Sequence, residues 1–108
     1  MQLFNDDCLK VLPTIPENSI NLIITSPPYN IGMNYNNYKD KRDDYVNWLI
    51  SIFNECCRVL KDNGHLFINL SSGKINPFTS YKIAENIKWK LQNNIIWAKA
   101  VEIDGYVR

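Results

Sequence analysis

Apolar runs and polar segments alternate along this chain in an order typical of α/β proteins. Residues 20–25 form a short apolar run rich in β-branched side chains, which predicts a buried strand. Ser26-Pro27-Pro28 follows directly, and because proline lacks an amide donor, the strand must end there. Residues 30–42 are rich in polar side chains and predict a loop.

An amphipathic helix is predicted over residues 43–60, where apolar side chains recur at steps of three and four. Asp43 and Asp44 lie at its start, where acidic side chains suit the helix dipole, and Asn63-Gly64 supply a stop. The predicted apolar face consists of Tyr45, Trp48, Leu49, Ile52, Phe53, Cys56, Val59 and Leu60.

Three further elements are predicted toward the C-terminus. Residues 65–70 form a second apolar run and predict a strand. Asn76-Pro77 is a favourable helix start, and Ile83, Ile87 and Leu91 follow at steps of four, which predicts a helix over 78–91. Residues 94–99 predict a third strand.

The resulting order, strand–helix–strand–helix–strand, favours an α/β sheet with right-handed crossovers. We expect one helical turn over residues 6–12, ended by Pro13, and a short strand or a loop around Asp104-Gly105. The length of 108 residues and the lack of a linker predict a single domain over residues 1–108.

Composition and charge exclude several classes of protein. Apolar residues make up 45% of the chain and charged residues 21%, as in ordinary globular proteins. The chain contains no run of about 18 apolar residues, so no membrane-spanning helix is predicted. The first ten residues carry two acids and no apolar block, unlike a secretory signal. A net charge of +1 argues against a strongly basic binder but leaves local nucleic-acid contacts open.

The three cysteines, Cys8, Cys56 and Cys57, are a poor disulfide framework and favour reduced thiols in the cytoplasm. We expect Cys56 in the core and Cys57 only partly buried. With His65 as the single histidine and no CxxC pair, the chain has almost no ligands for a zinc site, and no metal is expected.

The segment with most chemical content is Thr25 to Asn30, directly after the first predicted strand. In open α/β sheets, ligands bind beyond the carboxyl ends of the strands. Pro27 and Pro28 hold the backbone extended, so carbonyls near Ser26 and Pro27 become rigid acceptors. A planar ring could stack on Tyr29 while its exocyclic amine donates to Ser26 and to the Pro27 carbonyl. Alternatively, the segment is a rigid turn with a packed tyrosine.

Ser26-Pro27-Pro28-Tyr29 resembles the catalytic motif of amino-directed DNA methyltransferases. Asp7-Cys8-Leu9 is similar to that family's cofactor-binding turn, Arg58 to Leu66 is similar to its Arg-Val-Leu-Lys-Pro-Gly-Gly turn, and residues 94–99 are similar to a later strand. The resemblance covers nearly the whole chain. It implies a partial Rossmann-like fold dependent on S-adenosylmethionine, with double-stranded DNA as the partner.

The resemblance also implies a mechanism. Ser-Pro-Pro-Tyr is typical of enzymes that methylate cytosine N4, so we expect that target; adenine N6 is the alternative. The base flips out of the duplex, Tyr29 stacks on it, and Ser26 and the Pro27 carbonyl accept its amine protons. Methylation of RNA or of protein amides is disfavoured, because those enzymes resemble an Asn-Pro-Pro-Tyr pattern instead.

The resemblance assigns Asp7 and the Cys8 backbone amide to S-adenosylmethionine, although an acid at this position is also a common helix cap. The loop over residues 30–38 fits either a segment that closes over the base or a disordered polar stretch. Four lysines could follow DNA phosphates or form an ordinary solvated face. They are Lys74, Lys82, Lys88 and Lys90.

The glycine-rich cofactor loop of the family is missing, since Gly32, Gly64, Gly73 and Gly105 are far apart. The chain therefore resembles the N-terminal half of such an enzyme in the order that starts with the catalytic motif. Strand 20–25 would then be an apolar edge, which predicts self-association or a complementary polypeptide. A non-catalytic partner subunit or remnant is the alternative to an enzyme, and we expect little activity from the isolated chain.

Overall fold

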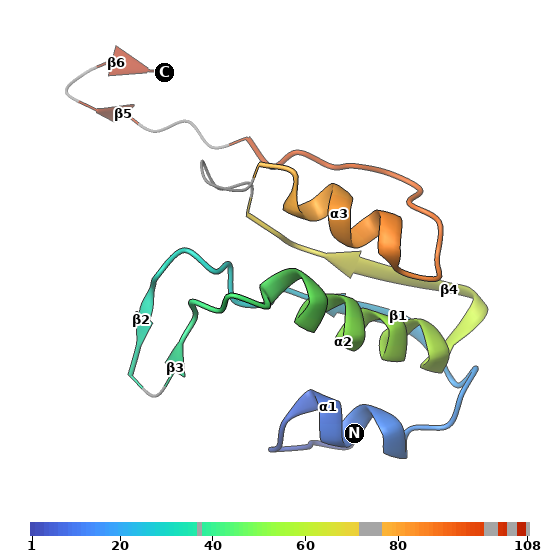
Figure 1. Ribbon diagram of the computed structural model, residues 1–108. Coiled ribbons are helices and arrows are strands. Elements are labelled where there is room, and N and C mark those ends of the chain that lie inside the picture. The colour runs from blue at the N-terminus through green and yellow to red at the C-terminus, as the bar shows by residue number, and fades with distance from the viewer. Residues whose placement is uncertain (37, 72–76, 99–101, 104–105, 108) are drawn as a thin grey trace.

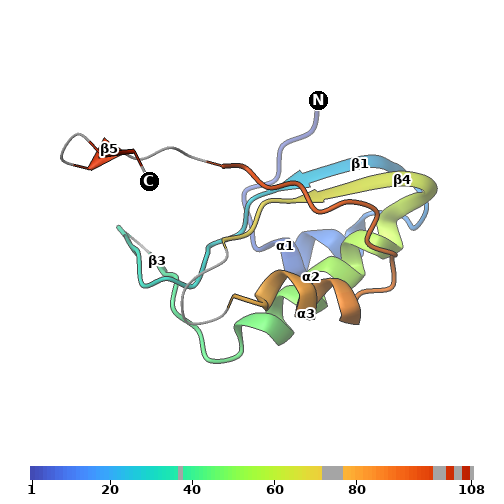
Figure 2. The same ribbon diagram turned by 90° about the horizontal axis from the view of Figure 1, so that it is seen from above.

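The computed structural model describes residues 1–36, 38–71, 77–98, 102–103 and 106–107, the last two pairs by their backbone. Two parallel strands form one layer, and three helices cover one face of it (Figures 1 and 2). The strands are β1 (Ile20–Thr25) and β4 (Leu60–Ile68), and the helices are α1 (Cys8–Val11), α2 (Tyr45–Val59) and α3 (Thr79–Asn86). The predicted α/β class with a parallel pair of strands is confirmed.

The pairing of β1 with β4 fixes which residues meet at each end of the sheet. The register runs from Leu22 opposite His65 to Thr25 opposite Ile68. One more hydrogen bond, from the Asn69 amide to the Thr25 carbonyl at 2.9 Å, continues the ladder past β4. The residues that follow the two strands therefore lie side by side.

The start of β4 differs from the prediction, because the chain passes from helix to strand at Leu60 and not at residue 65. Asn63-Gly64 lie within the strand, in the stretch where its pairing is irregular, and do not form a loop between helix and strand. A Cβ on Gly64 would lie 2.9 Å from the Lys61 carbonyl oxygen and 3.2 Å from that of Asn21. The glycine is needed here for the close approach of the two strands.

The core lies between α2 and the sheet, as the apolar face of the predicted helix requires. Leu49, Phe53 and Cys56 are buried, and they are joined by Ile83 from α3. Ile23, Leu66 and Ile68 pack against this cluster from the strands. Cys57 was expected to be partly buried and is instead fully buried, at 6% exposure. Burial raises the pKa of Cys56 to about 11, so its thiol stays protonated at neutral pH.

The third predicted strand, over residues 94–99, is wrong for the described residues 94–98. They have no strand pairing, and Ile95, Ile96 and Trp97 are each more than 70% exposed. A strand needs a partner for its backbone groups, and β-propensity alone does not supply one. The Asn94 side chain instead donates to the Tyr81 hydroxyl at 2.8 Å, which ties the segment to α3. Lys99 lies outside the described residues.

Helix α3 is shorter than the predicted range of 78–91. It ends at Asn86, whose side chain donates to the Lys82 carbonyl, and Ile87 is already extended. The Lys88 amide then donates to the Asn54 side chain on α2 at 3.3 Å. Local hydrogen bonds thus end the helix one turn early and leave Leu91 exposed. Pro77 precedes the cap residue Phe78, and the predicted cap Asn76 lies outside the described residues.

The N-terminal segment is fastened to α2 by one arginine. The Arg58 guanidinium donates to the carbonyls of Leu12, at 2.9 Å, and Ile15, at 3.2 Å, and pairs with Glu55. The predicted turn is present as α1, but it does not end before Pro13. It continues as a 3₁₀ turn, η1 (Leu12–Thr14), because proline is accepted in the first turn of a helix.

Two small antiparallel pairs complete the described chain: β2 (Asn34–Tyr35) with β3 (Tyr38–Lys39), and β5 (Glu102–Ile103) with β6 (Tyr106–Val107). For the tail we expected either a short strand or a loop, and the second pair shows short strands on both sides of Asp104-Gly105, which lie outside the described residues. None of the helices in the described part of the chain has the length and apolar character needed to cross a membrane.

We expect the isolated chain to self-associate. Parallel sheets are normally covered on both faces, but Figure 2 shows the helices on one face only. Ile23 and Leu66 pack against the core, so their neighbours in the strands, Leu22, Ile24 and Phe67, face the other way, and all three are exposed. Within the described residues β1 pairs only with β4. Sedimentation velocity should show dimers or larger species that dissociate in Ile24→Lys. Ser51→Lys adds the same charge on the α2 surface and is the control. A folded monomer at high concentration for the unchanged chain would contradict the prediction.

Candidate active site

The Ser26–Tyr29 turn lies at the carboxyl end of the sheet, as its position after β1 predicts. Ser26 is exposed, whereas Pro27, Pro28 and Tyr29 are half-buried. Parallel strands end together, so the turn shares this end with the residues that follow β4. Figures 1 and 2 show the chain leaving β1 here and continuing into the β2–β3 hairpin.

Two side chains contact the hydroxyl group of Tyr29. The Ser26 Oγ lies 3.0 Å from the Tyr29 oxygen, and either group can donate this hydrogen bond. The Asn69 Nδ2 donates to the same oxygen, also at 3.0 Å. Tyr29 is therefore held at its hydroxyl end from both strands, and its ring lies beside the exposed Ser26.

Tyr45 fastens the turn from the side of the helices. Its hydroxyl donates to the Pro28 carbonyl at 2.6 Å, across 17 residues. Burial, with smaller contributions from Asp40 and Tyr29, raises the pKa of Tyr45 to about 12. The phenol is therefore a neutral donor at all ordinary pH values, and the bond to Pro28 persists.

The contacts of the turn leave two acceptors with free capacity. The Pro28 carbonyl is occupied by Tyr45, while the Pro27 carbonyl accepts no hydrogen bond from the described residues. Ser26 Oγ has one partner, Tyr29, and keeps further capacity as an acceptor. Chemically, the arrangement can accept two hydrogen bonds from one amine next to an aromatic ring.

The loop after the turn is closed at its base. Asn30 adopts a left-handed conformation, with φ of 59°, and its side chain accepts from the Arg42 amide at 2.6 Å and donates to the Arg42 carbonyl at 3.2 Å. The buried Asp40 accepts from the Ile31 amide at 3.1 Å. The described part of the loop is therefore a hydrogen-bonded hairpin, and whether it closes over a base stays a prediction.

Asp7 and Cys8 are not brought into contact with the turn. The Asp7 Oδ1 accepts from the Leu9 amide at 2.9 Å, which is the capping role that any acid could take here. Both residues are exposed, and α1 begins on the side of the molecule where β1 and β4 end (Figures 1 and 2). Partial burial and the neighbouring Asp7 raise the pKa of the Cys8 thiol, so it is not an activated nucleophile.

The predicted lysines are divided between described and undescribed parts. Lys82, Lys88 and Lys90 are exposed on α3 and the segment that follows it, and Lys74 lies outside the described residues. Their exposure is compatible with a solvated face as well as with phosphate contacts.

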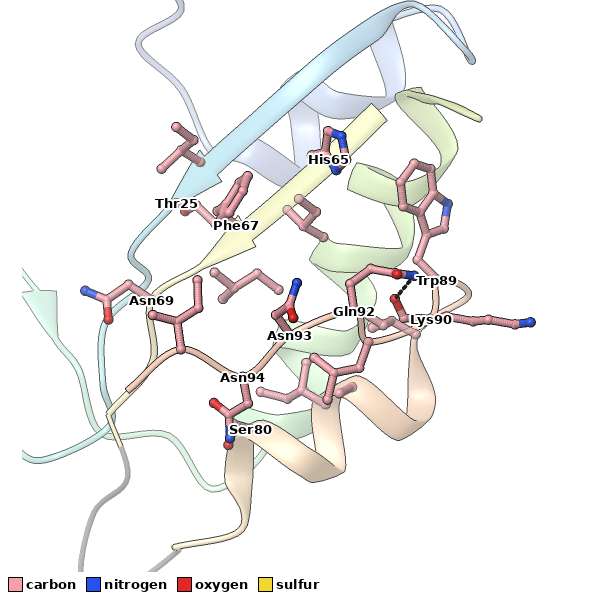
Figure 3. A pocket seen from close by; sticks show the side chains of 18 of the residues that line it. Thr25, His65, Phe67, Asn69, Ser80, Trp89, Lys90, Gln92, Asn93 and Asn94 are labelled. Atoms are coloured by element: carbon pink, nitrogen blue, oxygen red, sulfur yellow. Dashed lines mark hydrogen bonds between the residues drawn. The ribbon is translucent and has the colours of Figure 1, made fainter. Parts of the chain in front are cut away.

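A hollow of about 810 Å³ is lined by the end of β1, by β4, by α3 and by the segment that follows α3. Figure 3 shows its walls: His65 and Phe67 come from β4, Ser80 from α3, and Gln92, Asn93 and Asn94 from the segment after α3. Asn69 reaches its rim, but Ser26 and Tyr29 do not line it. The hollow therefore adjoins the turn through Thr25 and Asn69, although no residue of the Ser26–Tyr29 turn itself lines it.

Sequence reasoning missed two residues that shape the site. Tyr45 was assigned only to the apolar face of a helix, and Asn69 only to a strand, although both donate to the Ser26–Tyr29 turn. Asn69 could have been found, because a polar residue after the second of two parallel strands lies next to whatever follows the first. The hydroxyl of Tyr45 gave no sequence signal, since its partner is a backbone carbonyl.

Comparison with known proteins gives a consistent result. A family model described as DNA methylase matches residues 20–106. The chain is 38% identical to the type II methyltransferase M.MjaVI of Methanocaldococcus jannaschii, over 88% of this chain and 52% of that protein. It is 32% identical to the type II methyltransferase M.BglII of Bacillus subtilis, over 91% of this chain and 29% of that protein. It is 33% identical to the DNA adenine methyltransferase YhdJ of Escherichia coli, over 90% of this chain and 35% of that protein. The chain spans about half or less of these relatives.

Replacing Tyr45 by Phe tests the tether to Pro28. The loss of one neutral hydrogen bond should lower the free energy of unfolding by about 1 kcal/mol at pH 7. The raised pKa of Tyr45 means that the folded state keeps a proton which the unfolded state loses above about pH 10. The stability of the unchanged chain should therefore fall as pH rises from about 10 to 12, and part of that fall should be absent in Tyr45→Phe.

The measurement is urea unfolding at pH 7 and at several values above pH 9. The raised pKa of the buried Cys56 also makes the free energy of unfolding fall over a similar alkaline range. Cys56 is present in both the unchanged chain and Tyr45→Phe, so only the difference between these two proteins reports on Tyr45. Tyr35→Phe, on the exposed hairpin, is the control. Identical alkaline slopes for the unchanged chain and Tyr45→Phe would show that the tyrosine is not held neutral by burial.

Proposed function

Because this chain belongs to the DNA methylase family, we propose that it forms part of a DNA methyltransferase that methylates the exocyclic N4 amine of cytosine. The methyl donor in this proposal is S-adenosylmethionine, and the substrate is double-stranded DNA in the cytoplasm. The type II names of M.MjaVI and M.BglII support a place in a restriction–modification system.

One observation carries the proposal: the Ser26-Pro27-Pro28-Tyr29 turn presents two acceptors beside an aromatic ring at the carboxyl end of β1. Ser26 is exposed, the Pro27 carbonyl accepts no hydrogen bond from the described residues, and the Tyr29 hydroxyl is held by Ser26 and Asn69. An exocyclic amine has two protons to donate, and the ring to which it belongs has a flat face to stack. The site matches both features.

The proposed reaction needs the base to leave the duplex, at a cost of a few kcal/mol. Stacking on Tyr29 offsets part of this cost, by about 1–3 kcal/mol for a base on an aromatic ring. Hydrogen bonds from the amine to Ser26 and the Pro27 carbonyl would localise the nitrogen lone pair, which is otherwise delocalised into the ring. That lone pair would form the new nitrogen–carbon bond as the carbon–sulfur bond of the sulfonium breaks; S-adenosylhomocysteine would leave, and the nitrogen would lose one proton to solvent. Fixed positioning of this amine then accounts for most of the rate.

S-adenosylmethionine would supply an electrophilic methyl group on a sulfonium. Asp7 and Cys8 are the residues of this chain proposed to hold it, through the Asp7 carboxylate and the Cys8 amide, which has no intrahelical acceptor at the start of α1. Their exposure and their place toward the carboxyl end of the sheet support this role. A glycine-rich cofactor loop would come from a complementary polypeptide or another segment that completes a Rossmann-like sheet.

Adenine N6 remains the alternative target, because its amine needs the same two acceptors and the relative YhdJ is named a DNA adenine methyltransferase. The Ser26 residue favours cytosine. The second alternative is a non-catalytic partner subunit that keeps the fold without transferring a methyl group.

A chimera tests the proposal. The chain replaces the segment of M.MjaVI that it matches, and the product is incubated with duplex DNA and S-adenosylmethionine. Mass spectrometry of the nucleosides should detect N4-methylcytosine. N6-methyladenine alone would assign the adenine alternative. No product from a folded chimera, with M.MjaVI itself active in the same assay, would favour the non-catalytic role. The isolated chain should show little or no transfer.

In an active chimera, Ser26→Ala should lower kcat by roughly 10- to 100-fold, the range for a hydrogen bond to a group that gains charge. The dissociation constant for S-adenosylmethionine should change little, because Asp7 and Cys8 make no contact with Ser26. Calorimetric titration and single-turnover kinetics measure the two quantities. Ser51→Ala, on the surface of α2, is the matched control. Equal losses in cofactor binding and in kcat would contradict the role given to Ser26.

A further inference from the structure

The geometry points to Asn69 as a positioning residue for the base-binding turn: its amide orients the hydroxyl of Tyr29 toward Ser26. The Asn69 Nδ2, the Tyr29 oxygen and the Ser26 Oγ form a chain of hydrogen bonds with both steps at 3.0 Å. Asn69 is 40 residues from Tyr29 in sequence and comes directly after β4.

The direction of this chain follows from the groups involved. An amide nitrogen can only donate, so the Tyr29 oxygen accepts from Asn69. A hydroxyl that accepts one hydrogen bond donates the next more strongly, which favours donation from Tyr29 to Ser26. Ser26 Oγ then keeps a lone pair for an incoming amine, and its own proton is free to turn away from Tyr29.

The position of Asn69 is fixed by the sheet. Its backbone amide donates to the Thr25 carbonyl at 2.9 Å, one residue before Ser26. The same residue thus binds the start of the turn through its backbone and the far end of the turn through its side chain. Because β1 and β4 are in register up to this point, the backbone of Asn69 is held beside Thr25, and its exposed side chain reaches Tyr29 from there.

This role rests on the proposed function. A tyrosine ring held only through its own backbone would rotate about its side-chain bonds and lose entropy when a base stacks on it. With both neighbours bound to its hydroxyl, the ring is fixed before the base arrives, and the base meets a surface and an acceptor that are already aligned. Asn69 itself contacts neither the amine nor the methyl donor in this scheme.

Asn69→Leu tests the inference, because leucine has a similar volume and makes no hydrogen bond. The first measurement uses the 108-residue chain with ¹³C-labelled tyrosine, in which the Tyr29 ring signal is assigned by its loss in Tyr29→Phe. The ring signal should shift and broaden in Asn69→Leu and stay unchanged in Asn93→Leu, a control on the neighbouring segment. A Tyr29 signal that is the same in all three folded chains would overturn the inference.

The second measurement is a double-mutant cycle in the active chimera. Asn69→Leu should lower kcat about five-fold, as expected for one neutral hydrogen bond, with less change in KM for DNA. In the Tyr29→Phe background it should have almost no further effect, because its partner is gone. Additive losses would show that Asn69 acts independently of Tyr29 and would contradict the inference.

The two measurements separate this inference from the proposed function. A shifted ring signal in Asn69→Leu, together with an inactive chimera, would support the contact between Asn69 and Tyr29 while refuting methyl transfer. An active chimera with an unshifted Tyr29 signal and additive losses would support methyl transfer while refuting the role of Asn69. Thermal melting of each variant shows that the compared chains are folded.

Discussion

The parallel pairing of β1 with β4 is the constraint on which the rest of the structure depends. It places Thr25 beside Ile68 at the end of the ladder, so residues far apart in sequence start their loops from one point. The Ser26–Tyr29 turn and Asn69 meet there because the register allows no other neighbour. A shift of one residue would reverse the faces of β4 and turn Leu66 and Ile68 away from the core.

Helix α2 makes this pairing possible and also supports the turn. Its apolar face buries Leu49 and Phe53 against the sheet, which holds the two strands side by side. Tyr45 is the first residue of α2, and its hydroxyl donates to the Pro28 carbonyl. Helix α2 therefore stabilises the fold and also fixes the site. The burial of its apolar face stabilises the fold, and the burial of Tyr45 keeps its phenol neutral and able to donate to Pro28.

The sequence predicted the elements whose signals are local or periodic. The apolar steps of α2 and the prolines after β1 are examples, and both appear where expected. Residues 94–98 were misjudged because strand formation depends on a partner across space, and Asn86 ends α3 through a hydrogen bond that periodicity cannot reveal. In the site, Ser26 and Tyr29 were found from their motif, whereas Asn69 and Tyr45 act through contacts across many residues. Such contacts become visible only when the register is known.

The placement of the acceptors carries a consequence for where a methyl donor must lie. Ser26 Oγ and the Pro27 carbonyl would receive both amine protons in or near the plane of a bound base, and Tyr29 would cover one face of its ring. As the amine loses conjugation, its lone pair projects out of that plane. The donor therefore has to approach the face that Tyr29 does not cover. The chain supplies the acceptors and the stacking surface, and the position of the donor follows from them.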